Sequence, residues 1–284
     1  MKIGQIIEKI EAYHPYLKDG IANSMGVHNP TCDGLIFGDP DQDCTGIVTT
    51  VYASVDVIKK AIALGANFII THESTFYNNT DSTDWLNGNR VYEDKRRLLE
   101  ENHIVIFRDH DGMHHPQGDK DYIFYYIARV LGWEYYATDN KSRPRMFQIP
   151  ETTAGELADY LMKKFDLRGM RVIGDLQRKV SKVFFFMHFY GILYDGEPDR
   201  NGISFMEREK PDVIIPGEIV DYTFSEYARD AAQLGYGPIV MEMGHFNVEE
   251  PAMMIADTWL RGLVSPDIPI FPVKSGDSFQ YLIR

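Results

Sequence analysis

The regular alternation of short apolar runs with amphipathic segments constrains the fold more than any other feature of this sequence. Apolar runs such as 68–70 and 103–107 are short and rich in β-branched residues, as buried strands are. Segments such as 54–65 and 225–235 are amphipathic at helical spacing and end in glycine. Strands that alternate with helices along the chain predict an α/β fold.

Turn and cap residues give approximate bounds for these elements. We expect helices over residues 2–14, 54–65, 90–102, 122–132, 153–165, 225–235 and 248–263. We expect strands over residues 34–38, 46–53, 68–72, 103–107, 145–150, 182–191, 211–218 and 238–244. A polar connector after residue 137 marks a change in composition and predicts a boundary between two parts of the chain.

Composition and charge exclude several classes of partner. The chain has 284 residues and a formal net charge of −13, which argues against a nucleic-acid backbone or an anionic membrane as its main partner. No apolar run approaches the roughly 18 residues of a membrane-spanning helix, and the first residues lack the apolar core of a signal peptide. The two cysteines, Cys32 and Cys44, suggest reduced thiols. We therefore expect a cytoplasmic protein.

Three polar clusters follow predicted strands, at the point where each strand ends. They are His72 with Glu73; His110, Asp111, His114 and His115; and His245 with Glu249. Ligands in open α/β sheets bind at the carboxyl ends of strands, so we expect these side chains to share one site. Imidazole nitrogens and carboxylate oxygens together suit zinc, manganese or iron. The sequence therefore predicts a metal site.

Each residue also has a structural interpretation that needs no metal. His72 fits a hydrogen-bonded buried histidine, and His114 fits a solvated loop residue. Both glutamates of the clusters would complement the dipole of a helix N-terminus. His110 either orients a ligand, acts as a catalytic acid or base, or bonds to backbone. Glu218 either caps a helix or faces the same cavity.

Five motifs resemble the Nif-three-like family, often labelled GTP cyclohydrolase type 2-like. They are "CDGLIFGDPD" (32–41), "GANFIITHES" (65–74), "HDGMHHPQGDKD" (110–121), "PDVIIPGE" (211–218) and "GHFNVEE" (244–250). The similarity runs from residue 1 to the end of the chain and is weakest over 137–210. The resemblance implies a Nif-three-like fold with two similar α/β lobes and mixed sheets, one of residues 1–130 with 240–284 and the other of 131–239.

The resemblance also implies a dinuclear metal centre with five protein ligands. Carried over motif by motif, they fall on His72, Glu73, His114, His245 and Glu249. The chain departs from the family pattern twice, because a glutamate replaces the second histidine of the first motif and His114 replaces an aspartate. Three histidines and two carboxylates are kept. An alternative alignment gives the His114 role to Asp109 or Asp111.

From this resemblance we expect two divalent ions per chain, either zinc, manganese or iron. Two such ions that share one water lower its pKa and yield a bridging hydroxide, which predicts a metal-dependent hydrolase of a small polar substrate, with His110 as catalytic acid or base. The alternative is a non-enzymatic metal carrier or regulatory scaffold. The family also implies a ring-shaped homo-oligomer, often a hexamer. The sequence has no phosphate-binding loop or dinucleotide fingerprint.

Overall fold

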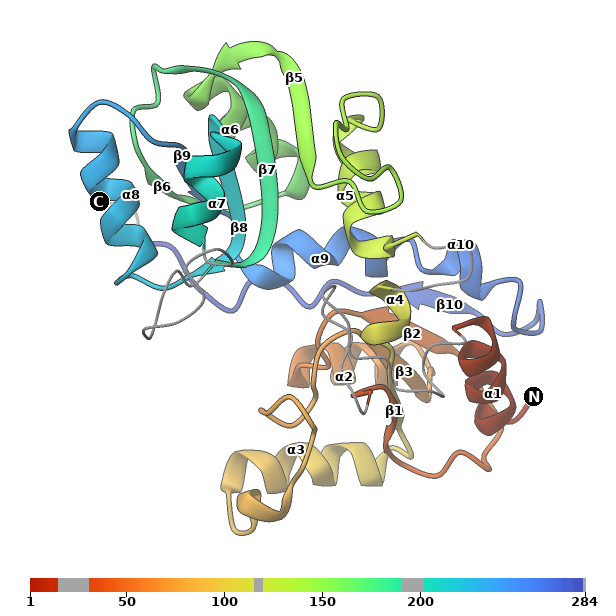
Figure 1. Ribbon diagram of the computed structural model, residues 1–284. Helices are drawn as coiled ribbons and strands as arrows, with labels where there is room; N and C mark the ends of the chain where they lie inside the picture. Colours follow the sequence, from red (N-terminus) through yellow and green to blue (C-terminus); the bar gives the residue numbers. More distant parts are fainter. Residues whose placement is uncertain (15–30, 115–119, 190–201, 283–284) are drawn as a thin grey trace. The chain divides into compact units, whose positions relative to one another are not determined.

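The computed structural model describes residues 1–14, 31–114, 120–189 and 202–282, which fall into two compact units. The first unit comprises Met1–Ile123 and Ala252–Ser275, and the second comprises Phe124–Pro251 and Gly276–Arg284. Each unit is built on one five-stranded mixed sheet with helices beside it (Figure 1). The predicted class, α/β in two lobes with mixed sheets, is confirmed.

The sheet of the first unit has the strand order β1–β4–β3–β2–β10. Its strands are β1 (Gly34–Phe37), β2 (Ile47–Thr50), β3 (Phe68–Thr71), β4 (Val105–Arg108) and β10 (Ile270–Pro272). Strand β1 is antiparallel to β4, and the other three pairings are parallel. The carboxyl ends of β2, β3, β4 and β10 therefore lie along one edge of the sheet.

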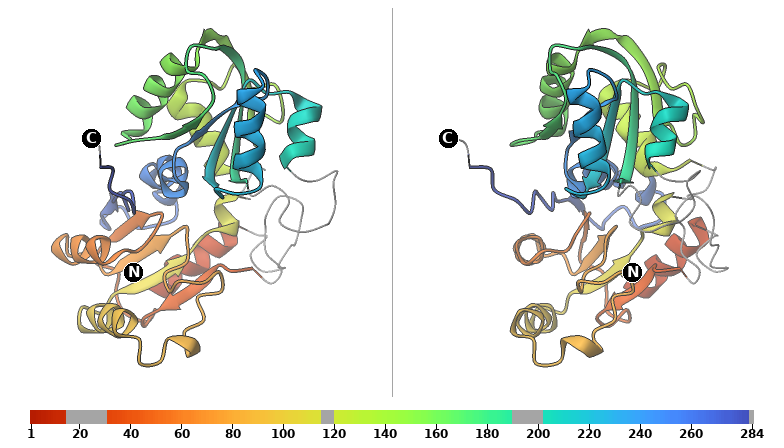
Figure 2. Two further views of the ribbon diagram at one scale, coloured as in Figure 1. Left: turned by 90° about the vertical axis from the view of Figure 1, so that its left-hand side faces the viewer. Right: turned by 60° about the vertical axis from the view of Figure 1, so that its left-hand side comes forward.

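Helices cover both faces of the first sheet. The helices of this unit are α1 (Ile3–Tyr13), α2 (Val55–Ala63), the 3-10 helix η2 (Asp84–Leu86), α3 (Arg90–Glu101), α4 (Asp111–His114) and α10 (Asp257–Leu260). Ile58 of α2 and Leu99 of α3 pack with Ile69 of β3 in one hydrophobic cluster. Helix α1 lies on the opposite face (Figure 2) and buries Ile3, Ile6, Ile7 and Ile10.

The sheet of the second unit has the strand order β5–β7–β8–β9–β6. Its strands are β5 (Met146–Thr153), β6 (Arg171–Ile173), β7 (Lys179–Phe189), β8 (Val213–Ile219) and β9 (Ile239–Glu242). The three central strands, β7, β8 and β9, are parallel, and β5 and β6 are antiparallel to their neighbours. The carboxyl ends of the central strands therefore also meet at one edge.

Alternating side chains of β7 pack against the elements on the two opposite faces of the second sheet. The helices are α5 (Tyr122–Leu131), α6 (Ala154–Phe165), α7 (Gly202–Glu209), α8 (Phe224–Gln233) and α9 (His245–Met254). The ring of Phe184 lies 4.3 Å from that of Phe205 in α7, whereas Phe185 contacts Trp133 on the other face. The aromatic run of β7 is therefore core packing, as its period of two requires.

Two predicted helix starts are confirmed by their caps. The Ser54 side chain accepts a hydrogen bond from the backbone N–H of Val57 at the start of α2. Thr153 and Glu156 bond reciprocally at the start of α6, which completes a capping box. Both caps satisfy N–H groups that the first helical turn leaves without an internal partner.

The structure differs from the expected lobes in the region after residue 240. Strand β9 pairs with β8 and β6, so β9 and the following His245 and Glu249 belong to the second unit. The single helix expected over 248–263 is two helices, α9 and α10, and α9 already begins at His245. Pro251 lies inside α9, where it supplies no backbone donor.

Five elements in the described ranges were not predicted. They are β6, β10, α4, α7 and the 3-10 helix η2. Strands β6 and β10 have three residues each, too few for their alternation of polar and apolar residues to be recognised.

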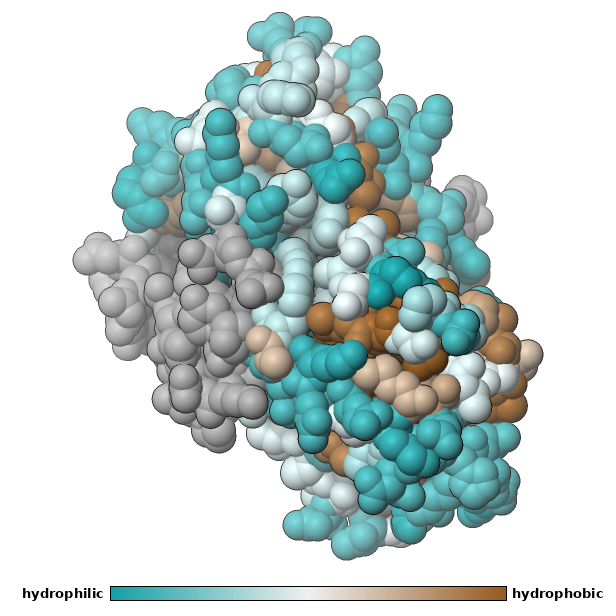
Figure 3. Space-filling view, turned by 90° about the vertical axis from the view of Figure 1, so that its right-hand side faces the viewer, coloured by the Kyte–Doolittle hydropathy of each residue, from teal (hydrophilic) through white to brown (hydrophobic). Residues whose placement is uncertain are grey.

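The described surface is largely hydrophilic on the side drawn in Figure 3, where hydrophobic residues gather in a limited area. Charged residues make up 25% of the chain, which is ordinary for a globular protein. Among the helices that the structure describes, none has the length and apolarity needed to cross a bilayer.

Candidate metal centre

Three histidines meet at the carboxyl ends of β3 and β4. His72 follows β3 directly, and His110 and His114 lie in the turn and short helix α4 after β4. Thr71 and Arg108 are register partners, so the two strands end side by side. The His72 ring stacks on that of His110 at 4.5 Å and meets that of His114 at 5.3 Å. One nitrogen from each ring lies within 4.8 Å of the others, a spacing that fits coordination of one ion.

The carboxylate of Asp33 holds the backbone that carries two of these histidines. One oxygen of Asp33 accepts the N–H groups of His110 and Asp111, at 2.7 and 3.0 Å, and the other accepts that of Gly112 at 2.8 Å. Burial raises the pKa of Asp33, and the charges of Asp109 and Asp111 raise it further. Asp33 therefore fixes the turn between β4 and α4 without belonging to the histidine cluster.

Neighbouring carboxylates orient the rings of the cluster. Asp121 lies 3.0 Å from Nδ1 of His114, and Asp111 lies 3.1 Å from Nδ1 of His110. A carboxylate on one ring nitrogen leaves the lone pair of the imidazole on the other, which is the arrangement that metal-binding histidines use. Burial, reinforced by the neighbouring His72, lowers the pKa of His110 to about 4. His110 is therefore neutral at pH 7, as a ligand must be.

Glu73 faces this cluster but has a cation beside it. Its carboxylate lies 3.7 Å from Nε2 of His110 and 3.5 Å from Nη2 of Arg108. The Arg108 side chain is buried and also lies 3.7 Å from Asp81. Arg108 was not predicted from the sequence, because it lies in a strand and its two acidic neighbours come from the loop after β3. It balances part of the negative charge beside the histidines.

The two alternatives to His114 have other partners. Asp109 is buried against Nδ1 of His14 at 3.0 Å. Asp111 accepts a hydrogen bond from the Thr31 hydroxyl at 2.7 Å, and among the described residues it belongs to a different possible metal group, with Cys32 and His110. His114, by contrast, lies in the cluster with His72. His115 falls outside the residues that the structure describes.

The second unit carries the other two expected ligands. Gly244, with a φ of +91°, turns the chain from the end of β9 into α9. His245 is the first residue of α9, and Glu249 lies one turn later. Nε2 of His245 is 3.0 Å from the Glu249 carboxylate, which is 2% exposed. The spacing of four residues thus brings both side chains together on one side of the helix.

Two further residues join His245 within the second unit. His188 and Glu218 are register partners on β7 and β8, and Nδ1 of His188 lies 2.8 Å from the Glu218 carboxylate. Nδ1 of His245 lies 3.6 Å from the same carboxylate. The prediction that Glu218 caps a helix is wrong, because it lies inside β8 and pairs with histidines. Sequence reasoning missed His188, which is embedded in an aromatic run.

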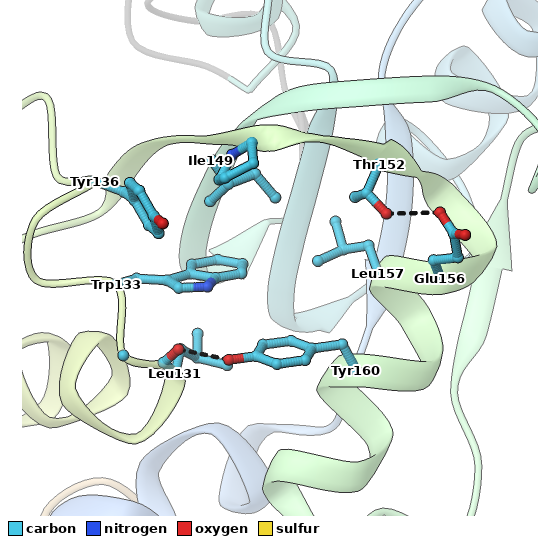
Figure 4. A pocket seen from close by; sticks show the side chains of 10 residues that line it. Leu131, Trp133, Tyr136, Ile149, Thr152, Glu156, Leu157 and Tyr160 are labelled. Carbon is cyan, nitrogen blue, oxygen red and sulfur yellow. Dashed lines mark hydrogen bonds between the residues drawn. The ribbon is translucent and has the colours of Figure 1, made fainter.

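A pocket in the second unit involves none of these residues. It has a volume of about 410 Å³ and is lined by aromatic and apolar side chains, among them Trp133, Tyr136 and Tyr160 (Figure 4). The Tyr160 hydroxyl donates to the Leu131 carbonyl oxygen at 2.6 Å, and Glu156 is engaged in the cap of α6. Tyr160 and Glu156 therefore take part in holding the fold together.

The fold and its strand-end clusters define an α/β protein with histidine and carboxylate groups that could bind metal ions. Comparison of the sequence with known families identifies the family to which this chain belongs. Residues 1–269 match the model of the Duf34/NIF3 (NGG1p interacting factor 3) family. The chain belongs to this family, and the resemblance seen in its motifs is confirmed.

Known relatives agree along the whole chain. A GTP cyclohydrolase 1 type 2 homolog of Clostridium perfringens is 24% identical over 294 residues, covering 99% of this chain and all of the relative. The crystal structure of the Staphylococcus aureus hypothetical protein SA1388 has a TM-score of 0.68 at 19% identity, with 99% of each chain covered. A Bacillus cereus protein related to NIF3 has a TM-score of 0.67 at 17% identity over the same share. These structures share the fold.

Proposed function

We propose that this protein binds divalent transition-metal ions and uses them to hydrolyse a small polar substrate. The observation that carries the proposal is the cluster of His72, His110 and His114, whose possible donor atoms lie within 4.8 Å of one another. Three imidazoles whose nitrogens lie this close together fit zinc or iron. Bound ions would supply Lewis acidity and would lower the pKa of water at the site.

The residues of the chain have distinct parts in this proposal. His72, His114 and His245 are ligands, with the carboxylates of Glu73 and Glu249. His110 lies in one cluster with His72 and His114, so we assign it to the ligand set as well. Asp33 and Asp121 hold the ligands of the first unit in place. The family resemblance alone supports one part of this proposal, namely that ligands from both units bind the same two ions.

The substrate class follows from the family rather than from the site. The relatives carry the name GTP cyclohydrolase 1 type 2 homolog, which describes hydrolysis of a nucleotide ring. A nucleotide-like or cyclic amide compound is therefore the first class of substrate to test. In the alternative function, a carrier or scaffold, the same ligands hold the metal without turnover.

Metal content and turnover together test the proposal. Protein reconstituted with zinc, manganese or iron(II) is expected to hold up to two ions per chain by elemental analysis. His72→Ala should lose metal and turnover on a panel of hydrolase substrates, whereas His103→Asn, at an exposed histidine with a φ of +54°, should lose neither. Asparagine tolerates that backbone conformation. Protein that binds no metal would refute the proposal, and tightly bound metal without turnover would favour the carrier.

A further inference from the structure

Three side chains that face one another end the three parallel strands of the second unit. His188 lies near the end of β7, Glu218 near the end of β8, and His245 directly after β9. One possible donor atom of each lies within 4.8 Å of the other two. The group is contained in one unit and shares only His245 with the ligands expected from the family.

We propose that His188, Glu218 and His245 form an outer metal site, at which the second unit takes up a divalent transition-metal ion from solvent. This inference rests on the proposed function, because it supplies ions to the ligands His245 and Glu249. It adds His188 and Glu218 to the proposed metal ligands.

The spacing of the donors fits coordination. Donors that lie about 2.0–2.1 Å from a tetrahedral ion are about 3.4 Å from one another. The Glu218 carboxylate is 2.8 Å from Nδ1 of His188 and 3.6 Å from Nδ1 of His245, so small side-chain rotations would place an ion among them. Two imidazoles and one carboxylate suit zinc or iron(II), and three protein donors leave a position for water or an incoming ligand.

Exposure falls steadily along the group. The side chain of His188 is 48% exposed, that of Glu218 38%, that of His245 17% and that of Glu249 2%. An ion from solvent therefore meets His188 and Glu218 first. Glu249 is at the buried end of this series.

His245 lies between two carboxylates, one beside each ring nitrogen. Nδ1 is beside Glu218 and Nε2 is beside Glu249, at 3.6 and 3.0 Å. A neutral imidazole offers one lone pair, so His245 binds one ion at a time. An ion beside Nδ1 leaves Nε2 facing the Glu249 carboxylate, and an ion beside Nε2 leaves Nδ1 facing the Glu218 carboxylate. A carboxylate thus supports the ring in either state.

Removing the inner carboxylate isolates the outer site for measurement. Glu249→Gln keeps the size and shape of the side chain beside Nε2 of His245, while the inner position loses its anionic ligand. The number of zinc ions per chain is measured after equilibrium dialysis against zinc sulfate. The single variant Glu249→Gln is compared with two double variants, in which His188→Ala or Glu218→Gln is added to it. Glu249→Gln with His103→Asn is the control, and circular dichroism of the metal-free proteins verifies their folding.

The expected result is the loss of one zinc ion per chain on adding either His188→Ala or Glu218→Gln, and no loss with His103→Asn. The ligands of the first unit are unchanged throughout this series. Equal zinc contents in Glu249→Gln with and without His188→Ala would overturn the outer site. That result is expected if His188 and Glu218 only pair with each other and bind no ion. Wild-type protein that binds no zinc would instead overturn the proposed function, so the two failures are distinguishable.

Discussion

Single carboxylates decide how precisely the histidines of the first unit are held. Asp33 accepts three backbone N–H groups from the turn that carries His110 and leads into α4. It is not a member of the candidate metal-binding cluster, and it acts on the histidines through the position of the turn. Residues of this kind control metal affinity because an ion demands donors within a few tenths of an ångström of their ideal places.

Asp33→Asn tests whether the turn held by Asp33 controls metal binding by the histidines. One acceptor oxygen becomes an NH₂ group that faces a backbone N–H, so the turn must shift. We expect zinc affinity to fall by about 10- to 100-fold, in the range found for residues that support metal ligands. The measurement is competition with a zinc indicator. Asp39→Asn, at an exposed loop residue, is the matched control, and an affinity equal to that of the control would contradict the role of Asp33.

Lys95 of α3 is the most deeply buried lysine among the described residues. Its side chain is 2% exposed, and Nζ donates to the Thr75 carbonyl oxygen at 2.8 Å while lying over the ring of Tyr52 at 4.6 Å. Burial lowers the pKa of Lys95 from 10.5 to about 7, and the charge of Asp81 opposes this only in part. The folded protein therefore releases the Lys95 proton at a lower pH than the unfolded chain does.

This difference in pKa makes stability depend on pH. Between about pH 7 and pH 10 the unfolded chain keeps the proton and the folded chain has lost it, so the free energy of unfolding should rise with pH, by at most about 1.4 kcal/mol per unit. Lys95→Met, which keeps the volume, should remove this slope. Urea unfolding at several pH values in that range measures it. If the free energy of unfolding depended on pH in the same way in the wild-type protein and in Lys95→Met, Lys95 would have an ordinary pKa.

At the scale of elements, α4 fits so closely beside α1 that one residue has no room for a side chain. A Cβ on Gly112 would lie 2.2 Å from Oδ1 of Asp109 and 2.5 Å from Nδ1 of His14, and both neighbours are fully buried. Neither has space to withdraw. The short helix can therefore follow β4 at this distance only with glycine at its second position.

Gly112→Ala should consequently destabilise the first unit, by about 1–3 kcal/mol, as overpacking of a buried site does. It should also weaken zinc binding, because α4 carries His114. Thermal unfolding and zinc competition measure the two effects. Gly262→Ala is the control, since a Cβ there would meet its nearest neighbour, the Trp259 carbonyl oxygen, at an ordinary 3.6 Å. Equal melting temperatures for the two variants would argue against the tight fit.

The sequence predicted the longer elements and the strand-end histidines, because both leave local signals. Hydrophobic period, caps and turns lie within a few residues of the elements that they define. The contacts that shape the clusters are not local: Asp33 is 77 residues from His110, and Glu218 is 30 from His188. One sequence without the fold could not pair them. For the same reason β9 and His245 were assigned to the first lobe, although the pairing of β9 with β8 and β6 places them in the second unit.

At the scale of the whole molecule, the two units repeat one plan. In each, parallel strands end in histidines beside carboxylates, and a helix begins immediately after them. The first unit presents three imidazoles with Glu73 partly balanced by Arg108, and the second presents two imidazoles with two glutamates. The units thus offer different donor sets, the first richer in nitrogen and the second in oxygen.

The family resemblance predicts a ring-shaped hexamer, and the single chain leaves large apolar side chains for other copies to cover. Tyr135, Phe279 and Leu282 are 97%, 73% and 94% exposed. Light scattering after size-exclusion chromatography should give a mass near six times the 32.6 kDa of one chain. Chelation of the metal should leave this mass unchanged, because all the proposed ligands come from one chain. A mass of one chain would refute the assembly, and a mass that falls only on chelation would place ligands of one ion on different chains.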